Sequence, residues 1–288
     1  MKKCAIITNS GYCNAEMKDQ TEKLKREFSA LGVVADGLSS DDFILSVEDG
    51  TIVCDLGKYD FIVWLNKDAL MSEILEKSSY KLFNSSKAVE ICDDKALTYA
   101  ALVSCGVPLV DSVFAPVGYY GTDKDGFLKK VADKLGYPLV AKLRVGSMGE
   151  GVSRIADAEE LKEFAEKVGE KPHFYQKFYG DGGKDVRVIV VGGKAIAAMR
   201  RVNDGDFRSN VACGGRGEKI EPCGEIKEIA EKCAAAIGLD YCGVDILESD
   251  RGYAVCEVNS NAFMKGITKV TGVNVARAYA EYIYKKIY

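Results

Sequence analysis

Two short apolar runs near the carboxyl end of the chain carry oxygen-bearing side chains. Asp245 lies in the first run, and Glu257 and Asn259 lie two residues apart in the second. Residues two apart on a strand point to the same face, so Glu257 and Asn259 share one face. Hard oxygen ligands converging from neighbouring strands are what a magnesium ion carrying nucleotide phosphates requires. This spacing points to chemistry on ATP.

Each of these residues also has a simpler explanation, as half of a buried ion pair or as a carboxylate at a strand edge. That explanation weakens when an acid and an amide share one strand face and a second acid lies on the neighbouring strand. Two carboxylates so close would repel each other unless a cation lies between them.

Lys142 closes an apolar strand immediately before a glycine-rich run. The run comprises Gly146, Ser147, Met148, Gly149, Glu150 and Gly151. Glycines let backbone N–H groups approach a phosphate closely, and a nearby lysine supplies positive charge. The Gly-Lys-Ser/Thr ending of a Walker A motif is missing. Taken alone, the run is equally typical of a hairpin tip beside a solvated lysine.

Arginines inside otherwise apolar strands need a partner when they face inward. The last part of the chain contains Arg187, Arg200, Arg201 and Arg208. An anionic substrate or a phosphate is one candidate partner, and a solvated outer face is an equal alternative for each. Arg200 and Arg201 are adjacent, so only one of them faces a given side of a strand.

The composition is that of an ordinary globular protein. The 288 residues are 47% hydrophobic and 28% charged, with a net charge of −4. The chain shows no basic stripe and no membrane-length apolar run, so nucleic acid and membrane partners are not expected. It shows no secretory signal, so a cytoplasmic location is expected. Cysteines such as Cys54, Cys233 and Cys256 sit in apolar segments and are interpreted as small buried hydrophobes.

The elements that must position these residues are predicted from apolar periodicity. Strands at 3–8, 33–36 and 60–65 with a helix between them predict a small open α/β unit over residues 1–88. A helical connection and a strand follow over 89–116, and a compact α/β unit over 117–178. Residues 179–288 begin with two antiparallel strands, 184–191 and 194–201, joined by Gly192-Gly193. They continue with a helix, the two carboxylate-bearing strands and a terminal helix.

Taken together, these motifs resemble the ATP-grasp superfamily and, within it, the RimK-type carboxylate–amine ligases, over about residues 85–275. The segments that carry the resemblance are Asp94-Lys95, Val140-Ala141-Lys142, Gln176-Lys177-Phe178, Asp185-Val186-Arg187, Gly205 to Asn210, Gly243 to Leu247 and Glu257-Val258-Asn259. The resemblance implies an α/β ATP-grasp fold. Its parts would be an N-terminal pre-ATP-grasp domain, a central lid and a C-terminal antiparallel-sheet domain.

The resemblance also implies roles for individual residues. Lys95 and Lys142 would contact ATP phosphates beneath the glycine-rich lid loop, and Gln176, Lys177 and Phe178 would meet adenine. Asp185 would lie near the ribose, and Arg208, Ser209 and Asn210 would line the junction of nucleotide and substrate. Asp245, Glu257 and Asn259 would hold two magnesium ions, or manganese, with Glu257 bridging them. Arg187 and one of Arg200 or Arg201 are candidates for steadying a reactive acylphosphate.

The implied reaction joins a carboxylate to an amine through an acylphosphate, with small-molecule or peptide substrates and a homo-oligomeric enzyme. One departure concerns the run after Asn259, Ser260-Asn261-Ala262-Phe263-Met264, which lacks the family's usual Pro-Gly turn. The metal ligands are retained, so the departure does not affect the expected use of ATP. It does affect the adjoining substrate pocket, so glutamate is only one of the amino acids that the enzyme could use. The alternatives are a D-alanine-ligase-like peptide ligase and a nucleotide sensor without turnover.

Overall fold

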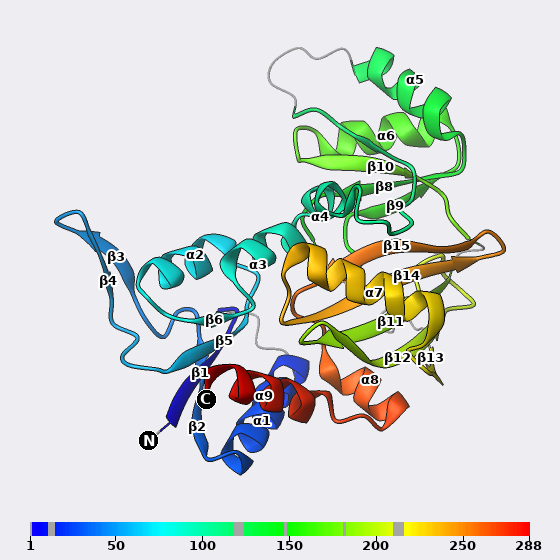
Figure 1. Cartoon of the computed structure of the whole chain (residues 1–288). Helices are drawn as coiled ribbons and strands as arrows, with labels where there is room; N and C mark the ends of the chain where they lie inside the picture. Colours follow the sequence, from blue (N-terminus) through cyan, green and yellow to red (C-terminus); the bar gives the residue numbers. More distant parts are fainter. Residues whose placement is uncertain (1, 11–14, 118–123, 147–148, 181–182, 210–215) are drawn as a thin grey trace.

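The computed structural model describes residues 2–10, 15–117, 124–146, 149–180, 183–209 and 216–288. The middle segment of the chain forms an upper unit, and the first and last segments lie together below it (Figure 1). The predicted α/β fold with an antiparallel C-terminal sheet is confirmed. The first sheet is parallel and the middle sheet is antiparallel. No helix in the described part of the chain is both long and apolar enough to cross a bilayer.

The first sheet is parallel, with strand order β2-β1-β5-β6. Its strands are β1 (Lys2–Thr8), β2 (Val33–Ser39), β5 (Phe61–Leu65) and β6 (Leu82–Phe83), and its helices are α1 (Ala15–Ala30) and α2 (Ala69–Lys77). The last helix of the chain, α9 (Val275–Ile287), packs against α1. Phe28 of α1, Phe61 of β5 and Tyr279 of α9 share one buried cluster. The two ends of the chain therefore form a single body.

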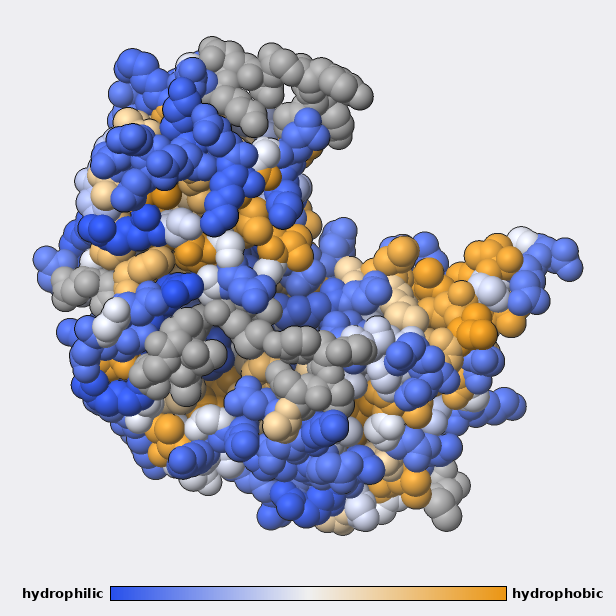
Figure 2. Space-filling model, turned by 180° about the vertical axis from the view of Figure 1, so that it is seen from behind, coloured by the Kyte–Doolittle hydropathy of each residue, from blue (hydrophilic) through white to orange (hydrophobic). Residues whose placement is uncertain are grey.

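A two-stranded hairpin extends from this first unit and was not expected from the sequence. It consists of β3 (Leu45–Glu48) and β4 (Thr51–Cys54) around an Asp49-Gly50 turn. Both turn residues have positive φ angles, 49° and 75°, as a two-residue hairpin turn requires. The hairpin projects from the body and exposes apolar side chains (Figures 1 and 2). The Asp-Gly pair was the available signal for it.

The middle sheet is antiparallel, with strand order β7-β10-β8-β9. Its strands are β7 (Ser112–Phe114), β8 (Leu139–Leu143), β9 (Val152–Ile155) and β10 (His173–Lys177), and its helices are α5 (Lys124–Leu135) and α6 (Ala158–Val168). Asp157 caps α6, because its side chain accepts hydrogen bonds from the first-turn N–H groups of Glu159 and Glu160. The two helices bury Val131 and Phe164 against Tyr175 of the sheet. The helices cover only one face of this sheet, so the other face, with Val140, Lys142 and Gln176, is open to the rest of the molecule.

The third sheet is antiparallel, with strand order β13-β12-β11-β14-β15. Its strands are β11 (Lys184–Val191), β12 (Lys194–Val202), β13 (Arg216–Ile220), β14 (Tyr241–Ser249) and β15 (Gly252–Asn259). Helix α7 (Gly224–Ile237) covers one face, and α8 (Met264–Thr271) and α9 lie on the other. The predicted antiparallel pairing of residues 184–191 with 194–201 is confirmed.

The helical connection is two helices, where the sequence suggested one continuous stretch. Helix α3 (Ser86–Asp93) ends and α4 (Lys95–Leu102) begins at Asp94, which has an extended backbone. The Asp94 carboxylate accepts hydrogen bonds from Ala96 N (2.8 Å) and Leu97 N (3.2 Å) and pairs with Arg144. A side chain that caps a new helix thus interrupts the apolar periodicity. The break places Lys95 in the first turn of α4.

Asn84 connects the first unit to the third sheet. Its side chain is 1% exposed, and its amide nitrogen donates to Tyr241 O (2.8 Å) and Ser260 O (3.0 Å). Its amide oxygen accepts from Asp240 N (2.7 Å) and Tyr241 N (2.9 Å). One side chain therefore satisfies backbone groups at the end of the β14–β15 pair where β14 begins and β15 ends.

Asn84→Ala is expected to lower the free energy of unfolding by about 3 kcal/mol, because each unsatisfied buried polar group costs about 1–3 kcal/mol. Urea denaturation measures this loss. Asn274→Ala serves as the comparison, because Asn274 caps α9 at an exposed position and its loss should cost about 1 kcal/mol. Equal losses in the two variants would contradict the connecting role of Asn84.

Candidate active site

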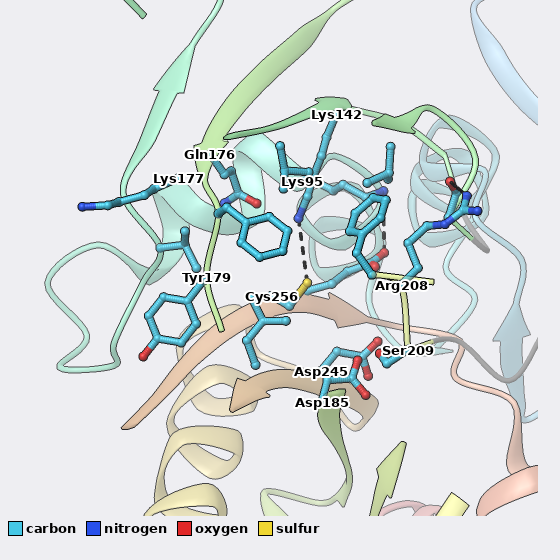
Figure 3. A pocket seen from close by; sticks show the side chains of 18 of the residues that line it. Lys95, Lys142, Gln176, Lys177, Tyr179, Asp185, Arg208, Ser209, Asp245 and Cys256 are labelled. Atoms are coloured by element: carbon cyan, nitrogen blue, oxygen red, sulfur yellow. Dashed lines mark hydrogen bonds and ion pairs between the residues drawn. The ribbon is translucent and has the colours of Figure 1, made fainter. Parts of the chain in front are cut away.

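One large pocket lies between the middle sheet and the third sheet (Figure 3). Side chains of α4, of the middle sheet and of the third sheet line it. Many residues singled out from the sequence line it, namely Lys95, Lys142, Gly146, Gly149, Gln176, Lys177, Phe178, Asp185, Arg208, Ser209, Asp245 and Glu257. We call it the central pocket. Segments that are distant in the sequence therefore meet at one place.

Other predicted residues lie beside the central pocket or outside the described chain. Gly151, Arg187, Arg200, Arg201 and Asn259 are described but do not line it. Ser147, Met148 and Asn210 lie outside the described residues. Gly151 still has a local reason to be glycine, since its φ is 69° and a Cβ there would lie 2.7 Å from Leu143 Cδ1.

Two buried ammonium groups face the central pocket. Lys142 ends the buried part of β8, and Lys95 begins α4; each residue is only 8% exposed. The Lys142 ammonium lies 3.8 Å from Cys256 Sγ. The Lys95 ammonium donates to Gly146 O (2.6 Å) and lies 3.6 Å from a Glu257 carboxylate oxygen. Burying cations with so little nearby negative charge is unfavourable, so the pocket is suited to an anion.

A buried charge network lies beside this pocket. It consists of Asp185, Arg187, Arg201 and Asp245. Arg187 donates to both oxygens of Asp245 at 2.7 Å, and Arg201 pairs with Asp185 and lies 2.9 Å from Asp245. Burial raises the pKa of the Asp245 carboxyl, but the charges of Arg187 and Arg201 outweigh burial and lower it to about 2. Asp245 is thus held as a carboxylate.

Glu257 lies directly opposite Asp245, and its side chain is less enclosed. The β14–β15 register pairs Asp245 with Glu257 and Gly243 with Asn259. The Glu257 side chain is 24% exposed, against 5% for Asp245, and its only cationic partner in the described chain is Lys95. The described residues of the chain include no cluster of three His, Cys, Asp or Glu side chains that could hold a metal ion. A metal here needs amide or phosphate oxygens as well.

Cys256 was wrongly interpreted as a purely buried hydrophobe, because it lines the central pocket. The β14–β15 register shifts between Asp245 and Ile246, whose partners are Glu257 and Val255. Cys256 is the extra residue of this bulge, so both Cys256 and Glu257 reach the pocket. Strict alternation would have placed them on opposite faces, and nothing in the local sequence signals the bulge.

Aromatic and apolar side chains also line the central pocket. Phe178 and Phe207 lie with ring centroids 6.4 Å apart, and Val140 and Leu247 are further apolar lining residues. Gln176 is 2% exposed and donates to Ser112 Oγ at 3.0 Å, which fixes its amide. The Lys177 side chain points away from the pocket, which leaves its backbone on the lining (Figure 3). Such a surface is suited to a planar base.

The arginines divide between the two sides of the third sheet. Arg200 pairs with Glu248 at 2.8 Å, away from the central pocket, while its neighbour Arg201 lies in the buried charge network. Arg208 pairs with Asp206 and also donates to Gly149 O (3.2 Å) in the glycine-rich loop. Phe207, Tyr179 and Lys184 line the pocket but were not singled out from the sequence.

The three sheets, with a pocket lined by two buried lysines between two of them, define an ATP-grasp protein. Residues 92–283 match the family described as the RimK-like ATP-grasp domain. The chain is 33% identical over 240 residues to glutamate–LysW ligase ArgX of Sulfurisphaera tokodaii, covering 79% of this chain and 83% of that protein. It is 30% identical over 264 residues to beta-citrylglutamate synthase B of Danio rerio, covering 85% of this chain and 64% of that protein.

Solved structures agree on the fold. A RimK domain ATP-grasp protein of Sphaerobacter thermophilus superposes with a TM-score of 0.74 at 18% identity, covering 96% of this chain and 98% of that chain. The ATP-grasp ligase PsnB, complexed with a precursor variant, Mg and ADP, gives a TM-score of 0.71 at 18% identity, covering 100% and 99%. The chain belongs to the RimK-like ATP-grasp family. It is an ATP-dependent carboxylate–amine ligase, as its motifs predicted.

Arg201→Met is expected to lower the free energy of unfolding by about 3–5 kcal/mol, because it leaves two buried carboxylates short of a partner. Arg200→Met is the matched control on the same strand. Its half-exposed pair with Glu248 should contribute at most about 1 kcal/mol. Urea denaturation of both variants checks the difference, and similar losses would show that the network does not stabilise the fold.

Proposed function

We propose that this ligase uses ATP and magnesium to transfer the γ-phosphoryl group of ATP to a carboxylate, which gives an acylphosphate and ADP. The α-amine of glutamate then attacks the acylphosphate, forming an amide and releasing phosphate and a proton. The observation that carries the ATP site is the pair of buried ammonium groups, Lys95 and Lys142, which line one pocket together with Phe178 and Glu257. Phosphoryl transfer needs positioning and charge neutralisation more than a catalytic base. Two buried cations meet that need.

The proposed ATP site follows the length of the central pocket. The triphosphate would lie by Lys95, Lys142 and the glycine-rich loop, and adenine would lie among Gln176, Phe178 and the Lys177 backbone. The ribose would lie near Asp185, although both Asp185 oxygens accept hydrogen bonds from Arg201. Arg208 and Ser209, with Asn210, would lie where the nucleotide meets the acid substrate.

Glu257 is the best candidate for the principal magnesium ligand. Three hydrogen bonds or close ion-pair contacts from arginines already occupy the Asp245 carboxylate, whereas Glu257 faces only the Lys95 ammonium at 3.6 Å. A carboxylate has about four lone-pair positions, so Glu257 has the larger free capacity. We propose two ions, bridged by Glu257 and held also by Asp245 and Asn259. Bound magnesium would neutralise phosphate charge.

Arg187 is the arginine best placed to steady the acylphosphate. It borders the central pocket through Asp245, and its side chain is 18% exposed, against 3% for Arg201. Arg201 would act by holding Asp185 and Asp245 in place. Arg200 pairs with Glu248 instead, and we assign it no part in the reaction.

Glutamate is proposed because it recurs in the names of relatives that act on different partners. These are glutamate–LysW ligase, beta-citrylglutamate synthase and N-acetylaspartylglutamate synthase. A D-alanine-ligase-like enzyme would instead use two small amino acids, and a sensor would bind ATP without turnover.

The test is ADP release by the full chain with magnesium and ATP against a matrix of amino acids and carboxylic acids, including acidic peptides. A pair that gives ADP and a product whose mass is the sum minus water supports the ligase and names its substrates. Turnover with L-glutamate as the amine is expected. Turnover only with pairs that lack glutamate would overturn the glutamate assignment, and tight ATP binding without ADP from any pair would favour the sensor.

Glu257→Gln is expected to keep the fold and to lower ADP release at least about a hundredfold, because an amide cannot bridge two cations as a carboxylate does. Steady-state ADP release at saturating ATP measures this. Glu218→Gln on β13 is the control, since Glu218 is exposed and lies outside the central pocket. Wild-type turnover in Glu257→Gln would contradict the metal assignment.

A further inference from the structure

Lys67 and Asp93 form an ion pair that the ATP site does not use. The Lys67 ammonium lies 3.7 Å from an Asp93 oxygen, and the two side chains are 30% and 26% exposed. Lys67 follows β5 of the first unit, and Asp93 ends α3. Neither residue lines the central pocket. The pair therefore lies at a junction between the first unit and the helix that leads to Lys95.

The position of Lys67 in the first sheet favours a ligand role. It lies beyond the carboxyl end of β5, which pairs in parallel with β1, and ligands of such sheets bind beyond these strand ends. Asn66 fixes the turn, because its side-chain oxygen accepts from Asn9 Nδ2 (2.8 Å) and from Asp68 N (2.9 Å). Lys67 thus projects from a rigid backbone between two anchored residues.

The pair continues toward the proposed reaction centre as a row of alternating charges. Asp93 lies 3.7 Å from the Lys67 ammonium and two residues before Lys95. The Lys95 ammonium in turn lies 3.6 Å from a Glu257 carboxylate oxygen. The Lys67–Asp93 pair is therefore close to the carboxylate that we assign to magnesium, on the side of the first unit.

The geometry leaves both members of the pair with unused capacity. A separation of 3.7 Å is longer than a hydrogen bond, so the ammonium keeps N–H donors and the carboxylate keeps acceptor positions. Burial raises the pKa of the Asp93 carboxyl, and Lys67 and Lys95 only partly offset burial. A further cationic partner would stabilise the Asp93 carboxylate, and an anionic partner would suit Lys67.

An α-amino acid carries these two partners on one carbon atom. We propose that Lys67 binds the α-carboxylate and Asp93 binds the α-ammonium of the amino-acid substrate, which places that nitrogen beside the reaction centre. This inference rests on the proposed ligase function and assigns the two residues that would recognise the α-carboxylate and the α-ammonium of its amino-acid substrate. An amine on a side chain or a simple alkyl amine lacks the group that Lys67 recognises.

Binding to the full chain, loaded with magnesium and a non-hydrolysable ATP analogue, tests the carboxylate half. Calorimetry compares L-glutamate with its α-carboxamide, which lacks only the α-carboxylate charge. The wild type should bind L-glutamate more tightly by about tenfold or more, as expected for one charge-assisted contact. Lys67→Met should lower the affinity for L-glutamate by a similar factor and leave the affinity for the α-carboxamide nearly unchanged, so the preference for L-glutamate disappears.

Asp93→Asn tests the ammonium half in the same way. The wild type should bind L-glutamate more tightly than glutarate, which lacks the amine, and the variant should lose that preference. Lys87→Met and Glu90→Gln are matched controls, because this exposed pair lies on the same helix with a separation of 2.7 Å. Both controls should retain both preferences, and ATP-analogue affinity should be unchanged in all four variants.

Several results would overturn the assignment while leaving the ligase intact. An equal loss of affinity for L-glutamate and for its α-carboxamide in Lys67→Met would show that the Lys67–Asp93 pair only stabilises the junction. Turnover of an amine without an α-carboxylate as efficient as that of any amino acid would also overturn it. If the matrix identifies a different amino acid, the comparison is made with that amino acid and its α-carboxamide. Failure of the ligase itself would appear separately, as absence of ADP from every pair.

Discussion

The buried charge network beside the central pocket determines how the third sheet is aligned. Asp185 and Arg187 lie on β11, Arg201 on β12 and Asp245 on β14, and the register places Arg201 opposite Asp185 and Arg187 opposite Asp245. Between them, Val186 and Val188 point to the apolar cluster under α7. A slip of one residue would move charges into that cluster and apolar side chains into the network. The buried charges are paired only in this alignment, so the sequence strongly favours this register of β11, β12 and β14.

This alignment also fixes the positions of Cys256 and Glu257 on β15. Because β14 is held by Arg187 and Arg201 through Asp245, its partner Glu257 is fixed across from Asp245. The bulge at Cys256 then turns two consecutive side chains toward the pocket, below Lys142 and Lys95. The network thus positions a less constrained carboxylate without using that carboxylate's own oxygens. Glu257, the proposed principal magnesium ligand, thus lies on the strand next to the one that carries Asp245.

Local patterns predicted the parts of the chain whose signal is local. Val140-Ala141-Lys142 is a buried strand, and Gly192-Gly193 joins antiparallel strands, as their sequences indicated. The Asp94 break and the Cys256 bulge could not be read in this way, since each depends on partners distant in sequence, Arg144 and the β14 ladder. The pairing of Lys67 with Asp93 is likewise a tertiary contact. The four segment boundaries and the individual site roles remain predictions.

The missing Pro-Gly turn after Asn259 has a structural counterpart in the first unit. The Asn261 side chain donates to Leu65 O (2.6 Å) and accepts from Gln20 (3.1 Å), whose own oxygen accepts from Met264 N (3.3 Å). Side chains from α1 and a backbone carbonyl of β5 thus hold the segment that a rigid turn would otherwise shape. Leu65 lies two residues before Lys67, so the same strand end supports this segment and carries the proposed amino-acid contact. Substrate selection in this ligase would accordingly depend on how the first unit meets β15, which the ATP-binding motifs alone do not specify.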